Sequence, residues 1–130
     1  MKNRRSIDDL LAEARRDLRR VTPAEAHAAA QEGGVLVDVR SEDERRRQGV
    51  LVPGAVHHPL SVVHWRLDPD VPTRNPKLPL DARLILLCRE GDSSSLAAAL
   101  LRAIGFPLAT DVIGGVDAWR VAGLPLDRYP

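Results

Sequence analysis

The sequence is poor in several residue types, and each scarcity excludes a class of protein. Cys88 is the single cysteine in 130 residues, so an internal disulfide is excluded and no oxidising compartment is indicated. Aromatic residues make up only 3%, so the core must be built from Leu, Val, Ile and Ala. No run approaches the roughly 18 apolar residues of a membrane span. A charged stretch follows the basic first residues, where a signal peptide would need an apolar one.

Charge and length narrow the class further. The net charge is +1, which gives no broad basic face for nucleic acid. A chain of 130 residues is long enough for one domain with a single core. We therefore expect a cytoplasmic protein with neither nucleic-acid nor membrane partners.

The first apolar pattern is that of an amphipathic helix. Apolar residues recur at helical spacing from Ile7 to Val21, with charged residues between them. This predicts an N-terminal helical extension over residues 1–20, followed by a domain over residues 21–130. The apolar face of the helix either packs on that domain or contacts a partner.

Strands and helices alternate in the rest of the chain. Val35–Val39 and Leu84–Leu87 are short apolar runs typical of buried parallel strands. Capping-box patterns at Thr22 and Ser41 predict helix starts, and a further helix is expected from about Ser94 to Ile104. This order predicts an α/β domain with a mostly parallel sheet.

Cys88 follows the second buried strand directly and precedes a polar loop and a helix. Ligands of α/β sheets bind beyond the carboxyl ends of the strands. A tight turn at a helix start, eased by Gly91, directs backbone N–H groups into one concavity that suits an anion. Thiols in such places lose their proton more readily than free thiols, which makes them nucleophiles. The alternative interpretation is an inert buried cysteine.

Two other uses of this strand–loop–helix unit are disfavoured. No Gly-Lys-Ser/Thr sequence follows the loop, which excludes a nucleotide P-loop. Cysteine phosphatases place an arginine six residues after the cysteine, and that position is Ser94 here. An arsenate reductase would also need a resolving cysteine, which this chain lacks.

The sequence resembles the single-domain rhodaneses, or rhodanese-like sulfurtransferases, from about Val21 to Leu126. The motifs occur in family order: "LVDVRSEDE", "GVLVPGAVHHPL", "CREGDSS" and "ATDVIGGVDAW". The resemblance implies a rhodanese-like three-layer fold, in which helices flank a mostly parallel central sheet. It also implies an enzyme that moves a sulfane sulfur from a donor, through a Cys88 persulfide, to a thiophilic acceptor. Thiosulfate or a persulfide would be the donor, and cyanide, a thiol or a sulfur-carrier protein the acceptor. No cofactor is implied. A non-catalytic module that binds or regulates a partner is the alternative.

The resemblance also assigns roles to individual residues. The active-site loop that would hold the persulfide comprises Arg89, Glu90, Gly91, Asp92, Ser93 and Ser94. Asp38, Arg40 and Glu44 are expected to support that loop; the alternative is a structural ion pair of Asp38 and Arg40 at the strand end, with Glu44 only as a capping-box residue. Independently of the resemblance, Arg66 is expected to contact the anion at the pocket mouth. Glu90 and Asp92 should weaken thiosulfate binding unless they face solvent.

A metal site is not expected. His57, His58 and His64 have no cysteine or carboxylate at ligand spacing, so they are interpreted as loop or surface residues. Trp119 is expected in the core.

Overall fold

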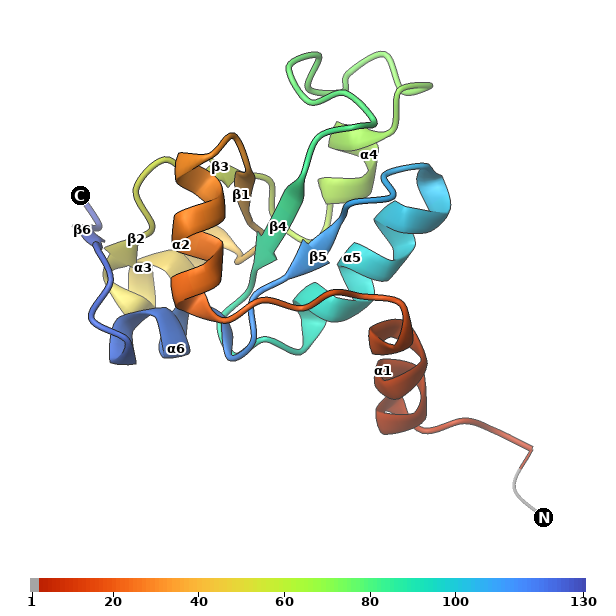
Figure 1. The fold of residues 1–130 in the computed structure, drawn as a ribbon, viewed down its shortest axis with the longest axis horizontal. Helices are drawn as coiled ribbons and strands as arrows, with labels where there is room; N and C mark the ends of the chain where they lie inside the picture. The colour runs from red at the N-terminus through yellow and green to blue at the C-terminus, as the bar shows by residue number, and fades with distance from the viewer. Residues whose placement is uncertain (1–2) are drawn as a thin grey trace.

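The computed structural model describes residues 3–130, in which helices and strands alternate (Figure 1). The elements in chain order are α1 (Ile7–Arg16), α2 (Pro23–Gln31), β1 (Val35–Asp38), α3 (Glu42–Gln48), β2 (Val50–Leu51), β3 (Val56–His57), α4 (Val63–Leu67), β4 (Leu84–Leu87), α5 (Ser93–Ile104), β5 (Thr110–Asp111), α6 (Gly115–Val121) and β6 (Asp127–Arg128).

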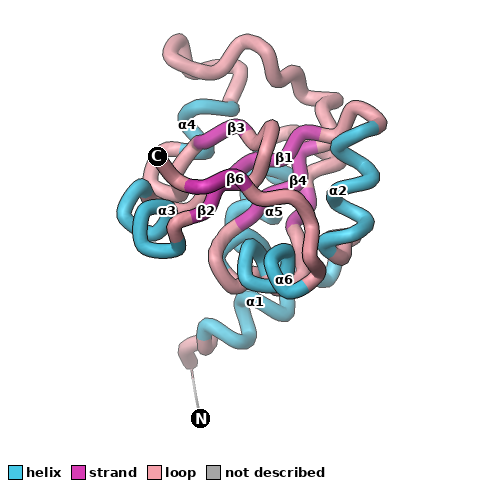
Figure 2. Tube along the Cα trace, turned by 90° about the vertical axis from the view of Figure 1, so that its left-hand side faces the viewer, coloured by secondary structure: helices cyan, strands magenta, loops and turns pink. Residues whose placement is uncertain are grey.

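The central sheet is parallel throughout and has the strand order β3-β1-β4-β5. β4 pairs with β1 along its full length, from Leu84 opposite Val35 to Leu87 opposite Asp38. β2 and β6 form a separate antiparallel pair, and Figure 2 shows the C-terminus beside β6. The predicted mostly parallel sheet is confirmed.

Helices cover both faces of the sheet, which gives the predicted three layers. Side chains of β4 alternate between the faces because successive residues of a strand point to opposite sides. Leu84 and Leu86 join a core cluster with α4 and α5. Ile85 and Leu87 join a second cluster with α2 and α6, in which Trp119 is buried as expected.

Local sequence signals account for where several helices begin and end. Thr22 and Ser41 each accept a hydrogen bond from the backbone N–H three residues on, and Glu25 and Glu44 complete the two capping boxes. Gly49 ends α3 in the left-handed conformation, at φ 70°. Both predicted capping boxes are confirmed.

The first helix is shorter than its apolar pattern predicts. The predicted helix ran to Val21, but α1 ends at Arg16. The chain then extends, and Val21 forms a parallel bridge with Val112 at the edge of β5. Val21 N–H donates to the carbonyl of Asp111, and Ile113 N–H donates to that of Val21. Sheet pairing therefore replaces the last helical turn, although Leu18 and Val21 fall at helical spacing.

α1 lies against α5, and Figure 1 shows it on the outer side of that helix. None of its side chains is fully buried, and Ile7 is exposed. The boundary between an extension and a domain at residues 20 and 21 stays a prediction. Among residues 3–130, no helix is long and apolar enough to cross a membrane.

Candidate active site

Cys88 lies at the carboxyl end of β4, where the sequence predicts a site. Its side chain is 5% exposed, and its Sγ accepts a hydrogen bond from the Gly91 N–H at 3.0 Å. α5 begins at Ser93, so the loop between strand and helix spans only residues 88–92.

The loop holds this shape because its carbonyl groups bind elsewhere. The carbonyls of Cys88 and Arg89 accept hydrogen bonds from the N–H groups of Val116 and Asp117, in the first turn of α6, at 2.9 and 3.0 Å. These two carbonyl groups consequently point away from the sulfur. Within residues 3–130, five more N–H groups of this segment have no hydrogen-bond acceptor: those of Arg89, Glu90, Asp92, Ser93 and Ser94. A row of unpaired amides next to a thiol is an anion cradle.

Glycines allow the loop to approach α6 this closely. A Cβ on Gly115 would lie 2.3 Å from the carbonyl oxygen of Cys88, and a Cβ on Gly91 would lie 2.5 Å from the backbone nitrogen of Gly114. Gly91 also has φ +92°, which L side chains rarely adopt. The double glycine of "ATDVIGG" therefore shapes the cysteine loop.

A buried serine and a buried carboxylate stand behind the cysteine. Ser94 Oγ lies 3.2 Å from Cys88 Sγ and donates to Asp111 Oδ2 at 2.7 Å. Asp111 is 0% exposed and also accepts a hydrogen bond from Ser95 Oγ at 2.8 Å. The sequence analysis missed Asp111, and the only signal in the sequence is an acidic residue inside the apolar stretch of "ATDVIGG".

Two arginines from outside the predicted domain reach the same place. Arg20 donates to Asp111 Oδ1 through Nε at 2.9 Å and to the Gly91 carbonyl through Nη2 at 2.8 Å. Arg15 donates to the Gly91 carbonyl at 2.9 Å, to Ser95 Oγ at 3.0 Å and to Asp92 Oδ1 at 3.0 Å. Sequence analysis missed both arginines.

The predicted supporting residues form a buried ion pair that does not hydrogen-bond to the cysteine loop. Arg40 Nε donates to Oδ1 and Oδ2 of Asp38 at 3.0 and 3.2 Å, Nη2 donates to Oδ2 at 2.7 Å, and Arg40 is 0% exposed. Arg40 also donates to Gln48 Oε1 and to the Val50 carbonyl, so the pair ties the end of β1 to α3 and β2. Support of the cysteine loop by these residues stays a prediction.

Glu44 and Arg66 occupy different surroundings. Glu44 caps α3 and lines a pocket of about 440 Å³ that Arg89, Asp117 and Arg120 also line, so it faces the outer edge of the cysteine loop. Arg66 lies against the proline-rich loop between α4 and β4, residues 68–83, where Nη1 donates to the Thr73 carbonyl at 3.5 Å. The structure shows no hydrogen bond between Arg66 and the loop, and its predicted anion contact stays a prediction.

The histidines bind neighbouring protein groups. His57 Nε2 contacts the Arg40 carbonyl at 2.8 Å, and His64 Nε2 contacts the Ala97 carbonyl at 3.1 Å. Burial lowers the pKa of His58, and the charges of Arg66 and His57 lower it further. The described chain contains no group of three or more His, Cys, Asp or Glu side chains placed to hold a metal ion.

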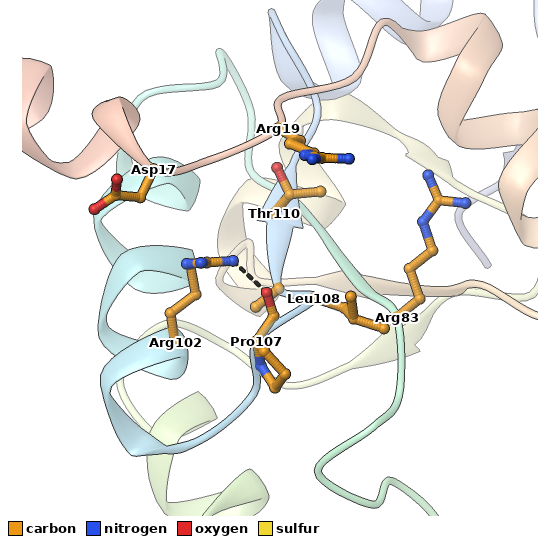
Figure 3. Close-up of a pocket in the computed structure, with 8 residues that line it drawn as sticks. Asp17, Arg19, Arg83, Arg102, Pro107, Leu108 and Thr110 are labelled. Atoms are coloured by element: carbon orange, nitrogen blue, oxygen red, sulfur yellow. Dashed lines mark hydrogen bonds between the residues drawn. The ribbon is translucent and has the colours of Figure 1, made fainter.

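A larger cavity lies at the opposite end of the sheet (Figure 3). It measures about 530 Å³, and its lining includes Arg83, which precedes β4, and Pro107, which precedes β5. Arg19 and Arg102 also line it, and the figure shows Arg102 bound to the Pro107 carbonyl. This cavity opens at the amino ends of the strands and is separate from the thiol.

Comparison with known proteins agrees with this geometry. Residues 22–122 match the rhodanese-like domain family. The chain belongs to this family. The thiosulfate sulfurtransferase GlpE of Pseudomonas savastanoi pv. phaseolicola is 35% identical over 107 residues, which cover 80% of this chain and 89% of the relative. A sulfurtransferase of Allochromatium vinosum is 32% identical over 98 residues, 75% of this chain and 82% of its own.

One solved structure resembles this protein over almost its whole length. It is a Rhodopseudomonas palustris protein of unknown function, described as a possible tyrosine phosphatase. The two chains are 28% identical, with a TM-score of 0.87 over 98% of each. At this coverage the likeness includes α1, which lies before the family match.

Proposed function

We propose that the protein is a rhodanese-type sulfurtransferase in which Cys88 is the nucleophile. The observation that carries the proposal is the Gly91 N–H bound to Cys88 Sγ at the head of a row of unpaired amides. Such a cradle stabilises a thiolate and also a persulfide anion, because each bears a negative charge that backbone N–H groups can bind.

The reaction consists of two displacements on sulfur. The Cys88 thiolate attacks the sulfane sulfur of thiosulfate, the new S–S bond forms, and sulfite leaves with the electron pair of the broken bond. The product is the Cys88 persulfide anion. An acceptor, cyanide or a thiolate, then attacks the outer sulfur, which leaves as thiocyanate or as the acceptor's persulfide and restores the Cys88 thiolate. No cofactor takes part in this scheme.

The acidic residues of the loop do not oppose an anionic donor. The side chains of Glu90 and Asp92 are 65% and 69% exposed, and Asp92 is paired with Arg15 at 3.0 Å. Exposed carboxylates are screened by water and interact weakly with an anion in the cradle. Thiosulfate is therefore a suitable donor, alongside low-molecular-weight persulfides.

The low solvent exposure of Cys88 favours small acceptors, or acceptors with a narrow reactive end. A side chain that is 5% exposed admits a small ion, a small thiol or the extended end of a sulfur-carrier protein. A carrier protein stays our prediction for a partner, and the cytoplasm stays our prediction for the location.

A phosphatase reaction is less well supported by the site. Ser94 stands where a cysteine phosphatase has its arginine, and it faces the buried carboxylate of Asp111. At that position a phosphoryl dianion would meet a neutral hydroxyl group instead of the positive charge that clamps its oxygens in a phosphatase.

The test is to incubate the protein with thiosulfate and measure its intact mass. We expect one added sulfur atom, about 32 Da, on the wild type and none on Cys88→Ser. Cyanide should then remove the added mass and produce an equal amount of thiocyanate. A wild type that gains no sulfur from thiosulfate or from small persulfides would contradict the proposal and favour a non-catalytic binding module.

A further inference from the structure

We propose that Arg15 and Arg20, which precede the rhodanese-like match, are positioning residues that orient the cysteine loop and neutralise the carboxylate behind Cys88. The inference deepens the proposed function and rests on it. Both arginines lie before residue 22, where the family match begins, so the family pattern does not assign them a role.

The first step concerns the carbonyl of Gly91. The Gly91 N–H donates to Cys88 Sγ, while its carbonyl accepts from Arg20 Nη2 at 2.8 Å and from Arg15 Nη2 at 2.9 Å. A glycine has no side chain to restrict its backbone, so contacts from outside must fix its orientation. Two guanidinium groups on the carbonyl hold this peptide unit turned outward, which leaves the N–H directed at the sulfur.

The second step concerns the charge of Asp111. This carboxylate is 0% exposed, and Arg20 binds both of its oxygens, Nε to Oδ1 at 2.9 Å and Nη2 to Oδ2 at 3.2 Å. A buried carboxylate without a cation would oppose a second negative charge on Cys88, one hydroxyl group away. By neutralising Asp111, Arg20 therefore allows Cys88 to carry a negative charge as a thiolate.

The third step concerns the single hydrogen of the Ser94 hydroxyl. Ser94 Oγ lies within reach of both Cys88 Sγ and Asp111 Oδ2, but a hydroxyl donates only once. While the sulfur is a thiol, the hydrogen lies toward Asp111. Asp111 keeps Ser95 and Arg20 as donors, so Ser94 can rotate its hydrogen toward the sulfur when that becomes an anion.

The other charged groups near the sulfur are arranged in pairs. Arg15 faces Asp92 at 3.0 Å and binds Ser95, while Arg89 lies 4.0 Å from both Glu90 and Asp117 on the solvent side. Arg20 is thus the cation in direct contact with the buried carboxylate among residues 3–130.

The backbone keeps Arg20 in place. The bridge between Val21 and Val112 fixes the following residue to the edge of β5, next to Asp111. Arg15 belongs to the last turn of α1, which packs on α5. Figure 1 shows the chain between α1 and α2 passing the ends of β4 and β5, where the cysteine loop lies.

The test measures alkylation of Cys88 by iodoacetamide against pH in the full chain, a readout that does not depend on sulfur transfer. Arg20→Met should move the half-maximal rate to higher pH and slow alkylation at pH 7 about tenfold. Arg20→Lys, which keeps the charge, should retain most of the wild-type rate. Arg19→Met is the matched control and should behave as wild type, because Arg19 lines the cavity at the opposite end of the sheet.

The carboxylate supplies the decisive variants. Asp111→Asn should move the profile to lower pH, and the double variant Arg20→Met with Asp111→Asn should return it toward the wild type. An unchanged profile for Asp111→Asn would overturn the electrostatic role, even if Arg20→Met fails to fold. If the Arg20 and Asp111 variants shift the alkylation profile as expected but no donor gives a persulfide, the proposed function is contradicted. The electrostatic role of Arg20 would then still hold.

The orienting role has its own measurement. Arg15→Met should increase hydrogen exchange in a peptide covering residues 88–92 and slow persulfide formation, and it should shift the alkylation profile less than Arg20→Met does, because Arg20 still faces Asp111. Unchanged exchange in that peptide would overturn the orienting role.

Discussion

At the residue scale, Gly91 combines a backbone conformation and a close contact that no other residue type can meet. We expect Gly91→Ala to lower the free energy of unfolding by at least about 1 kcal/mol, because φ +92° is strained for alanine. The new Cβ would also displace the loop from Gly114, so the rate of persulfide formation should fall about a hundredfold or more.

Gly33→Ala is the control for the Gly91 prediction. Gly33 has φ +99° but no atom within 4 Å of an added Cβ, so it shares the strain and lacks the contact. This variant should lose comparable stability and keep its activity. Equal activity losses in both variants would show that strain alone accounts for the effect.

The buried pair of Asp38 and Arg40 leads to a stability prediction. Asp38→Ala leaves a buried guanidinium without its carboxylate, and we expect a loss of about 3–5 kcal/mol in urea unfolding. Asp43→Ala removes the partner of two exposed arginines, Arg46 and Arg47, and should change stability by less than about 1 kcal/mol. Similar losses for the two variants would contradict this account of the pair.

At the element scale, a pH-sensitive contact joins His58, which follows β3, to the loop between α4 and β4. Asn75 Nδ2 lies 3.3 Å from His58 Nε2, a contact in which only a neutral imidazole can accept. Burial, Arg66 and His57 hold the pKa of His58 below 6.5 in the folded state. The unfolded chain therefore binds a proton first as the pH falls, and folding stability should decrease below about pH 6.5.

His58→Gln tests this contact. The variant lacks the titrating group, so its urea-unfolding free energy should change less than that of the wild type when the pH is lowered from 7 toward 5. Parallel curves for the two proteins would contradict the assignment to His58.

The element scale also shows how far the sequence alone could lead. Buried strands, capping boxes and the cysteine loop were predictable because each rests on neighbouring residues. Arg20 and Asp111 are 91 residues apart, and no local pattern joins them. The end of α1 was predicted wrongly for the same reason, since Val21 obeys helical spacing but pairs with a strand that comes much later in the chain.

At the scale of the whole molecule, one sheet serves two cores. Leu86 packs in the cluster with α5, and Ile85 packs in the cluster with α2 and α6, although the two residues are adjacent in β4. The two clusters should therefore unfold together, so truncation of Ile85 or of Leu86 should lower the stability of the whole domain. We expect Ile85→Ala and Leu86→Ala each to cost about 2–5 kcal/mol.

The measurement is denaturant unfolding in a Trp65→Phe background, followed by two probes, fluorescence of the buried Trp119 and far-UV circular dichroism. Trp119 lies on the Ile85 side, so an independent Leu86 side would give separate transitions in Leu86→Ala. Coincident transitions in both variants are the expected result. Separate midpoints would show that the two sides unfold independently.

The burial of the Cys88 thiol also affects how the protein responds to oxidation and how its persulfide sulfur is transferred. Because the chain has no second cysteine, no thiol of the same chain can take the outer sulfur of the Cys88 persulfide. An external acceptor must therefore remove it. With 5% of Cys88 exposed, two copies of the protein cannot bring their sulfurs to bonding distance without opening their loops. Oxidising conditions should therefore not produce disulfide-linked dimers, while a small acceptor can still reach the persulfide sulfur.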